Sequence, residues 1–306
     1  MSADQAVCLY PSLCAKIAPV EHLDTSSFWL DTLGGQGTLQ TGSPWRLVHW
    51  ATIDSTNAAA HRTLHKLTAE QMPLAHQTVL STDQQTQGKG QQNRVWVTES
   101  NRDLAMTVVL TKGLPTACPF ALNLAVSLAV LEGVENAIPR LASPAWEIKW
   151  PNDLMLRGQK AGGILIENNW RGAQWSSAVV GIGLNIGGKP PFPNATQVLD
   201  DQLPTSDTLQ NIREHILSQL EKRLSEVHSP EVLLRQFHER LLGWGKAQRW
   251  QLDGQEIRGI LESISLQGKI CVLEVSGTNC YSPGEVGWLG MEPGADSMKG
   301  LRPPRI

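Results

Sequence analysis

The amino-acid sequence predicts an α+β protein, in which a mixed β-sheet backed by helices is followed by a small β domain. Three observations lead to this class. Short apolar runs typical of strands occur throughout residues 45–186, separated by two longer helical patterns. Two amphipathic helices are expected over residues 208–242. Residues 243–306 carry only short β-rich runs between glycine-containing turns.

The first predicted elements form a strand–helix–strand unit. Residues 45–51 predict a strand, and the quartet Asp54-Ser55-Thr56-Asn57 supplies N-cap side chains for a helix ending near Glu70. Residues 78–82 predict a short strand. Residues 84–94 are polar and contain glycine, so they predict a loop.

The middle of the chain predicts the interior of the sheet. Residues 104–110 predict a strand of the buried type. Pro119 begins a helix that reaches Ala137, because its fixed φ suits the first helical turn. Three further strands are expected, over residues 146–150, 160–167 and 178–186.

The remaining elements place a boundary near Leu242-Gly243. Helices are expected over residues 208–227 and 231–242, and β runs over residues 257–264 and 269–275. The predicted organisation is an N-terminal extension, a main domain and a small β domain, over residues 1–44, 45–242 and 243–306.

Composition excludes several classes of protein. The chain has 306 residues and a formal charge of −3, so it has no global attraction to nucleic acid or to an acidic membrane surface. Its five cysteines show no CxxC spacing, so neither a disulfide framework nor a zinc site is indicated, and a reducing cytoplasm is the simplest setting. The most apolar stretch, residues 120–134, is too short to span a membrane. Residues 1–45 contain one basic residue, Lys16, which argues against a targeting segment and against DNA binding.

A glycine-containing loop is the most informative segment. Gly88 and Gly90 allow close approach of the backbone to a ligand, Lys89 and Arg94 add positive charge, and Trp96 offers a flat face for a ring. The loop matches neither the GxxxxGK[ST] nor the GxGxxG pattern. By itself it is equally typical of a polar surface loop.

Three further segments carry polar side chains at strand ends. The segment Lys149-Trp150-Pro151-Asn152-Asp153 contains a proline that ends a strand. The Asp153 carboxylate that follows can hold Mg²⁺, although an ordinary turn also explains this segment. Lys160 begins a strand in which Gly162 and Gly163 permit close approach of the backbone to a ligand. Lys160 is therefore a candidate ligand contact, and an ordinary surface lysine is the alternative. Asn185 is the polar residue of an apolar strand; it needs hydrogen-bond partners, either a ligand or its own neighbours.

Taken together and in this order, these segments resemble the biotin protein ligases. KWPND, KxxGIL (residues 160–165), GxGxN (residues 181–185) and the quartet at residues 54–57 match motifs of that family over residues 45–242. The resemblance implies a class II synthetase-like mixed sheet and a C-terminal SH3-like β-barrel. It also implies ATP-dependent biotinylation of a lysine on a biotin carboxyl carrier protein domain, through biotinyl-5′-AMP. Biotin and ATP with Mg²⁺ would be the small molecules.

The resemblance also implies roles for individual residues. The biotin-binding residues would be Ser55, Thr56, Gln85, Gly88, Lys89, Gly90, Lys160 and Gly163. The ATP and adenylate contacts would be Gln91, Arg94, Trp96, Lys149, Asn152 and Asn185. Lys160, Lys89 and Arg94 would be catalytic, because a carboxylate and a triphosphate must be brought together by positive charge. Asp153 would hold the metal.

The loop departs from the family pattern GRGRxGR. Gln91 stands where arginine is expected and Asn93 where the third glycine is expected; Asn tolerates positive φ better than most residues. A lipoate ligase or octanoyl transferase of the same fold, and an inactive biotin-binding paralogue, are the alternatives. A transferase would need a nucleophilic cysteine near the Lys160 strand, and none lies there. Residues 1–44 show no helix-turn-helix, so no DNA partner is expected, and a homodimer is left open.

Overall fold

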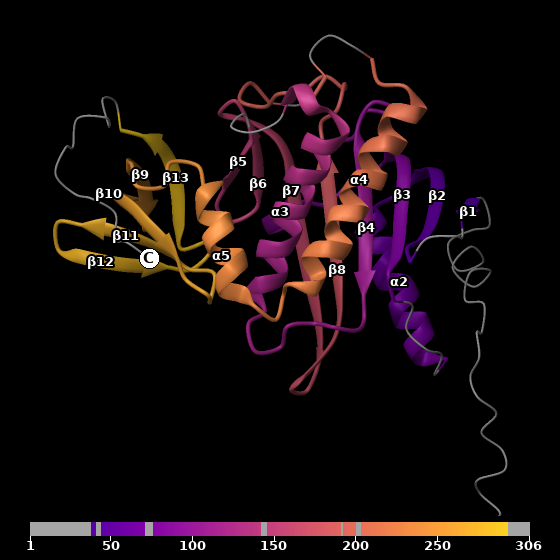
Figure 1. The fold of residues 1–306 in the computed structure, drawn as a ribbon, viewed down its shortest axis with the longest axis horizontal. Helices are drawn as coiled ribbons and strands as arrows, with labels where there is room; N and C mark the ends of the chain where they lie inside the picture. Colours follow the sequence, from indigo (N-terminus) through magenta and orange to yellow (C-terminus); the bar gives the residue numbers. More distant parts are fainter. Residues whose placement is uncertain are drawn as a thin grey trace, which may run out of the picture.

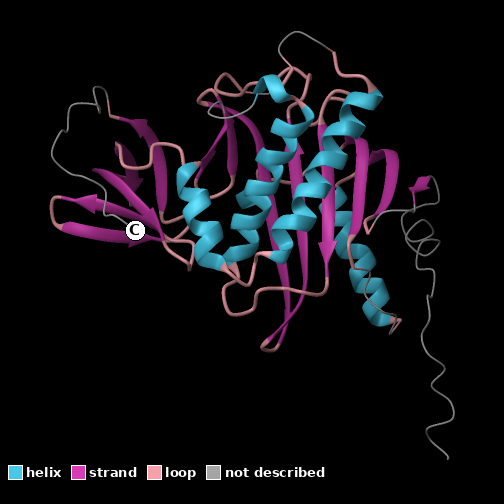
Figure 2. Ribbon diagram, viewed as in Figure 1, coloured by secondary structure: helices cyan, strands magenta, loops and turns pink. Residues whose placement is uncertain are grey.

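A computed structural model describes residues 38–40, 44–70, 76–141, 146–190, 192–199 and 203–292. The fold consists of a large sheet with helices on both faces and a smaller sheet beside it (Figures 1 and 2). Nearly all of the N-terminal extension lies outside the described residues, so the expectation that it holds no helix-turn-helix stays a prediction.

The large sheet has eight strands in the order β1-β2-β3-β4-β8-β7-β6-β5. Their bounds are β1 (Thr38–Gln40), β2 (Arg46–Ile53), β3 (Thr78–Gln85), β4 (Leu104–Leu110), β5 (Trp146–Lys149), β6 (Asp153–Leu156), β7 (Gln159–Arg171) and β8 (Gln174–Leu184). Strands β2 and β3 run parallel and the other neighbours antiparallel. The predicted mixed sheet is therefore confirmed.

The helices divide the sheet into two faces. One face carries α3 (Phe120–Ala137), α4 (Ser206–Ser225) and α5 (Pro230–Glu239), and the opposite face carries α2 (Thr56–Ala69) (Figure 1). Two short 3₁₀ turns, η2 (Gln91–Asn93) and η3 (Pro139–Leu141), complete the helical elements of the described chain. Among the described helices α3 alone is apolar and long enough to cross a membrane, and 72% of it is buried inside the fold. Here it is the central core helix.

Helix α2 is held to the sheet by small and branched residues. Ala59, Ala60, Leu64 and Leu67 pack on a separate apolar cluster of the sheet that includes Trp50. Ser55 is the N-cap, and its Oγ accepts from the backbone N–H of Ala58 at 3.4 Å. The start of this helix was predictable from the sequence because Ser and Asp are favoured cap residues.

The smaller sheet is antiparallel in the order β12-β11-β10-β9-β13. Its strands are β9 (Ala247–Leu252), β10 (Gln255–Ile264), β11 (Ile270–Glu274), β12 (Gly277–Tyr281) and β13 (Val286–Met291). It docks against the main sheet through specific contacts: Trp150 Nε1 donates to the carbonyl of Gly268 at 3.0 Å, and Lys149 Nζ lies 5.0 Å from the ring centre of Trp288. The predicted boundary at Leu242-Gly243 falls between α5 and β9.

Two sequence-based expectations are wrong. Cys271 and Cys280 form a disulfide, because the tight β11–β12 hairpin places them directly opposite each other; a spacing of nine residues gave no sign of this register. A disulfide is uncommon in a reducing cytoplasm, so the compartment stays a prediction. The three strands expected over residues 146–186 are in fact four. Strand β5 ends before Pro151 as predicted, but Asp153 begins a further strand, β6, which runs back antiparallel to β5 after the cis peptide bond Trp150-Pro151.

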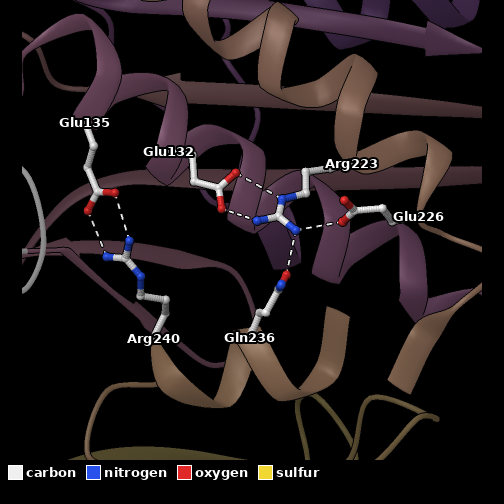
Figure 3. Close-up of polar contacts among 6 residues, drawn as sticks. All are labelled: Glu132, Glu135, Arg223, Glu226, Gln236 and Arg240. Atoms are coloured by element: carbon white, nitrogen blue, oxygen red, sulfur yellow. Dashed lines mark hydrogen bonds and ion pairs between the residues drawn. The ribbon is translucent and has the colours of Figure 1, made fainter. Parts of the chain in front are cut away.

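A buried ion-pair network joins the three helices of one face (Figure 3). The Arg223 guanidinium, with a side chain only 7% exposed, contacts both oxygens of Glu132 on α3 and the carboxylate of Glu226 after α4. It also donates to Gln236 on α5 at 2.6 Å. Alongside it, Arg240 makes a bidentate pair with Glu135 on α3, at 2.8 Å for both bonds. The network fixes how α3, α4 and α5 pack.

Removing one member of the network should destabilise the fold. Glu132→Ala leaves the Arg223 charge buried with fewer partners, and such a loss costs about 3 kcal/mol. The free energy of unfolding in urea measures this. The exposed ion pair of Arg258 with Glu256 is the control, because Arg258→Ala should leave the unfolding free energy unchanged. Equal effects of the two substitutions would contradict the structural role of the network.

His238 connects α5 to the small sheet and should make that junction sensitive to pH. Its Nε2 accepts from the backbone N–H of Ile264 at 2.8 Å, and burial lowers the pKa of the ring below its usual 6.5. The unfolded chain binds the proton more readily, so stability from His238 is complete above pH 6.5 and falls on acidification towards the folded pKa. Between pH 8 and pH 5 the unfolding free energy should therefore fall more for the wild type than for His238→Gln. Parallel losses would contradict this.

Candidate active site

The site lies on the α2 face of the large sheet, where the start of α2 meets the end of β3. Gln85 Oε1 accepts from the Thr56 backbone N–H at 2.9 Å and lies 3.2 Å from Thr56 Oγ1. Gln85 Nε2 lies 3.5 Å from Thr98 Oγ1. Thr56 and the adjoining Ser55 are 3% and 2% exposed. The structure thus brings together Ser55, Thr56 and Gln85, as the sequence predicted.

A further row of polar side chains, absent from the sequence-based candidates, continues from Thr56. Thr107 on β4 is fully buried, with Oγ1 2.7 Å from Thr56 Oγ1 and 2.6 Å from Asn57 Oδ1. Asn57 Nδ2 donates to Glu167 at 2.7 Å, and His61 lies 3.3 Å from the same oxygen. The His61 ring beside Glu167, followed by the hydrogen bond from Asn57, lowers the pKa of Glu167 against the opposing effect of burial. In the sequence, this row was signalled by Asn57, as a member of the quartet at residues 54–57, and by a threonine inside an apolar strand.

Lys149, Asp153 and Lys160 form a charged cluster at the other end of the site. Asp153 Oδ1 lies 2.5 Å from Lys160 Nζ, and its Oδ2 lies 3.2 Å from Lys149 Nζ. Because one carboxylate is shared between two ammonium groups, the cluster keeps a net positive charge. Such a cluster can attract a carboxylate or a phosphate.

The same cluster bears on the expected metal site. Both oxygens of Asp153 are engaged by lysine ammonium groups, and no group of three His, Cys, Asp or Glu side chains gathers within the described residues. This donor set does not fit a preformed magnesium site. A metal ligand role for Asp153 stays a prediction.

The glycine loop is folded back on itself. The backbone N–H of Trp96 donates to the Gly88 carbonyl at 2.9 Å, and the backbone N–H of Gly90 donates to the Arg94 carbonyl at 2.7 Å. The loop therefore forms a small hairpin. Its left-handed residue is Gln92 (φ 53°), next to the Asn93 that the sequence favoured for this conformation. Gly88 is required here because a Cβ atom would lie 2.3 Å from the Trp96 carbonyl oxygen.

The loop also borders a cavity of about 490 Å³. The cavity is lined by Gly88, Lys89, Gly90, Gln91 and Arg94 from the loop, among others, and by Leu165 and Glu167 from β7. Lys89, Gln91 and Arg94 are exposed, so their charged and polar ends face solvent. The predicted loop residues therefore share one opening.

Trp96 lies against the backbone of β7 and β8 at two glycines. A Cβ atom at Gly183 would lie 2.4 Å from its indole, and one at Gly163 would lie 3.5 Å away. Lys160 Nζ is 5.9 Å from the ring centre, and the indole Nε1 is buried with no hydrogen-bond partner among the described residues. The glycines of the KxxGIL and GxGxN motifs thus form a floor without side chains.

Asn152 and Asn185 use their amide groups within the protein. Asn152 Nδ2 donates to the Ile164 carbonyl at 2.7 Å, and Asn185 Nδ2 to the Thr196 carbonyl at 3.2 Å. Both side chains are buried and tie strand ends to neighbouring backbone. This matches the local-bonding alternative for Asn185, and contact of either residue with a nucleotide stays a prediction.

Comparison with known proteins agrees with this geometry. Residues 51–185 match the family model described as the biotin/lipoate A/B protein ligase family. The biotin–[acetyl-CoA-carboxylase] ligase of Mycobacterium tuberculosis is 34% identical over 216 residues, which are 68% of this chain and 77% of that protein. The bifunctional ligase/repressor BirA of Bacillus subtilis is 30% identical over 175 residues, which are 54% of this chain, and the match spans about half of its length, 51%.

The fold agrees as well. The biotin protein ligase of Aquifex aeolicus, solved in complex with biotin and ATP, superposes with a TM-score of 0.62 at 21% identity, over 79% of this chain and 97% of that one. The fold and the sequence match together define a protein ligase with a glycine-containing loop beside a mixed sheet. The chain belongs to the biotin/lipoate A/B protein ligase family. Its similarity is to the biotin protein ligases within that family, as the motifs implied.

The glycine floor can be tested by adding one methyl group. Gly183→Ala places a Cβ atom against the Trp96 indole, and overpacking of this kind costs about 1–3 kcal/mol. The thermal midpoint should therefore fall, whereas Gly287→Ala, where nothing lies within 4 Å, should leave it unchanged.

A double-mutant cycle assigns this cost to the contact. In a Trp96→Ala background, Gly183→Ala should cost less than half as much as in the wild type, because the indole is gone. Strictly additive costs would show that Trp96 does not rest on this floor.

Proposed function

We propose that the protein is a biotin–protein ligase that uses ATP to attach biotin to a lysine of a biotin carboxyl carrier protein domain. The proposal rests on two features of one site. The ion-paired cluster of Lys149, Asp153 and Lys160 carries net positive charge, and the side chains of Thr56 and Gln85 are polar but uncharged. Biotin has an anionic carboxylate at one end and a polar but uncharged urea at the other. The 34% identity with a named biotin–[acetyl-CoA-carboxylase] ligase supports the same substrate.

The reaction has two steps. A carboxylate oxygen of biotin attacks the α-phosphorus of ATP. The bond between this phosphorus and the oxygen that bridges to the β-phosphorus breaks, which gives biotinyl-5′-AMP and pyrophosphate. The neutral amine of the carrier lysine then attacks the acyl carbon, AMP leaves with the bonding electrons, and the amine loses one proton.

The residues of the chain contribute charge and position rather than a covalent nucleophile. Lys160 stabilises the negative charge that grows on the acyl-phosphate oxygens, and Asp153 holds Lys160 and Lys149 in place. Lys89 and Arg94 neutralise the triphosphate from the loop. Mg²⁺ would arrive bound to the phosphates of ATP, where few protein ligands are needed.

The proposal also includes the carrier domain as the protein partner, a homodimer as the oligomeric state and the cytoplasm as the location. A lipoate or octanoate ligase is the competing function. It is disfavoured because lipoate and octanoate present no group at their apolar end that could use the polar side chains of Thr56 and Gln85.

ATP–pyrophosphate exchange tests the function directly. Exchange should depend on biotin and not on lipoate or octanoate, and a carrier domain should then become labelled on lysine. Exchange with lipoate alone would establish the competing function, and no exchange with any of the three acids would leave an inactive paralogue.

Lys160→Ala should lower the exchange rate on the order of 10²–10³-fold, because one preorganised donor to the developing charge is lost. Lys222→Ala is the matched control, since Lys222 is exposed on α4 on the opposite face of the sheet. A Lys160 variant within threefold of the control would show that Lys160 has another role.

A further inference from the structure

The Asp103 carboxylate is buried just before β4 and is held by backbone groups. Its residue is 6% exposed. Oδ2 accepts from the backbone N–H of Glu99 at 2.9 Å, and Oδ1 accepts from those of Ile186 at 3.0 Å and Gly188 at 3.2 Å. Burial raises the pKa of Asp103, and these three hydrogen bonds act against that rise. The position of this carboxylate is therefore set by two backbone segments, and we call the four residues the Asp103 cluster.

The two segments that Asp103 joins both lead to the site. Glu99 follows the glycine loop, three residues after Trp96, whereas Ile186 and Gly188 follow β8 and its GxGxN motif. Strands β4 and β8 are antiparallel neighbours, so the residue before β4 and the residues after β8 meet at one edge of the sheet. One carboxylate thus links the exit of the loop to the end of β8.

The Asp103 cluster is closely packed and requires a carboxylate. A Cβ atom at Gly188 would lie 2.6 Å from Asp103 Oδ2 and 2.8 Å from the Glu99 Cβ, so only glycine fits there. Three N–H donors converge on the two oxygens of Asp103. An asparagine in its place would point an NH₂ group at one of these donors, because its amide has a single acceptor atom.

On the β8 side, hydrogen bonds continue from the Asp103 cluster to Lys160. The backbone N–H of Asn185, next to Ile186, donates to the Ala161 carbonyl at 2.8 Å. The Asn185 side chain donates to the Thr196 carbonyl, and the Thr196 N–H donates to the Lys160 carbonyl at 2.8 Å. The backbone of Lys160 is therefore tied to the segment that begins at the Asp103 cluster.

On the loop side, the Asp103 cluster fixes the chain that carries Trp96. The Trp96 indole lies against Gly183, two residues before Asn185, and Lys160 Nζ lies 5.9 Å from the centre of the ring. The indole and the ammonium group thus come from the two segments that Asp103 joins. Their separation depends on how the loop exit sits relative to the end of β8.

We propose that Asp103 is a positioning residue for adenylation, which holds the Trp96 ring and the Lys160 ammonium group at a fixed separation. The inference rests on the proposed function and deepens it. Asp103 acts through the backbone and not by contact with a substrate. A shift of about 1 Å in a group that must meet the reacting atoms can lower a rate on the order of 10²-fold, so a distant residue of this kind can control catalysis.

Asp103→Asn is the direct test, because it keeps the size of the side chain and removes one acceptor. The kcat for biotin-dependent ATP–pyrophosphate exchange by the full chain should fall at least about tenfold. The Kd for biotin, measured by titration calorimetry, should stay within about threefold of wild type, because Thr56 and Gln85 make no hydrogen bond to the Asp103 cluster. A loss in kcat without a matching loss in binding is the signature of positioning.

A double-mutant cycle shows whether Asp103 acts through Lys160. In a Lys160→Ala background, Asp103→Asn should lower kcat by less than about threefold, because the group that it positions is gone. Independent effects would instead multiply, and the double variant would then lose the full product of the two single losses.

Glu135→Gln is the matched control for a merely structural effect. It also converts a buried carboxylate to an amide, since the Glu135 side chain is 10% exposed and accepts two bonds of 2.8 Å from Arg240. Its free energy of unfolding should fall, because a buried ion pair is broken, while kcat should stay within about twofold of wild type.

Gly188→Ala reaches the same contact from the β8 side and leaves the carboxylate intact. The added methyl group displaces Asp103, so kcat should again fall while the Kd for biotin is kept. This variant keeps the inference testable if Asp103→Asn does not fold.

The outcomes are distinct. A kcat within about twofold of wild type in a folded Asp103→Asn or Gly188→Ala variant, or multiplicative losses in the cycle, overturns the inference and leaves the proposed function standing. A wild-type protein without biotin-dependent exchange overturns both.

Discussion

The close approach of the loop and helix α2 to the backbone of strands β7 and β8 is the constraint on which the site depends. At Gly181 and Gly183 a single methyl group would lie 2.4 Å from the Asn57 amide or the Trp96 indole. No side chain fits there, because contacts below 3 Å are strongly repulsive. The absence of side chains on one face of two adjacent strands thus creates the space in which the site is built.

The opposite face of the same strands has the reverse requirement. There Ile164, Val180 and Ile182 pack into the main apolar cluster with α3, and the residues between them face the site. Because strand residues alternate between faces, each strand can be a core element and a ligand floor at once. The ion pairs of Arg223 and Arg240 lie among the helices that cover the core face, apart from the charges of the site.

The KWPND segment has two roles. Lys149 and Asp153 belong to the charged cluster, while Trp150 donates to Gly268 and Lys149 also lies over Trp288 of the small sheet. The same five residues therefore build the site and hold the second sheet in place. A change in this segment should disturb both, which makes its residues poor choices for separating catalysis from stability.

Much of the fold was predictable from the sequence because its signals are local. Strand β4 was expected over its full length from a run of seven residues, and the starts of α2 and α3 from Ser55 and Pro119. Strand β6 was missed, since it is short and follows a turn that looked like the end of a strand. The disulfide was missed because it depends on the register of a hairpin.

The sequence by itself determined the class of protein, because loop glycines, lysines and the KWPND motif have chemistry that is visible without coordinates. Only the tertiary structure decided how those residues are used. Asp153 pairs with two lysines, Asn152 and Asn185 bond to backbone, and Trp96 lies on the glycine floor. The row of side chains from Glu167 to Thr56 joins residues up to 110 positions apart, and only the packing of α2 on the sheet brings them together.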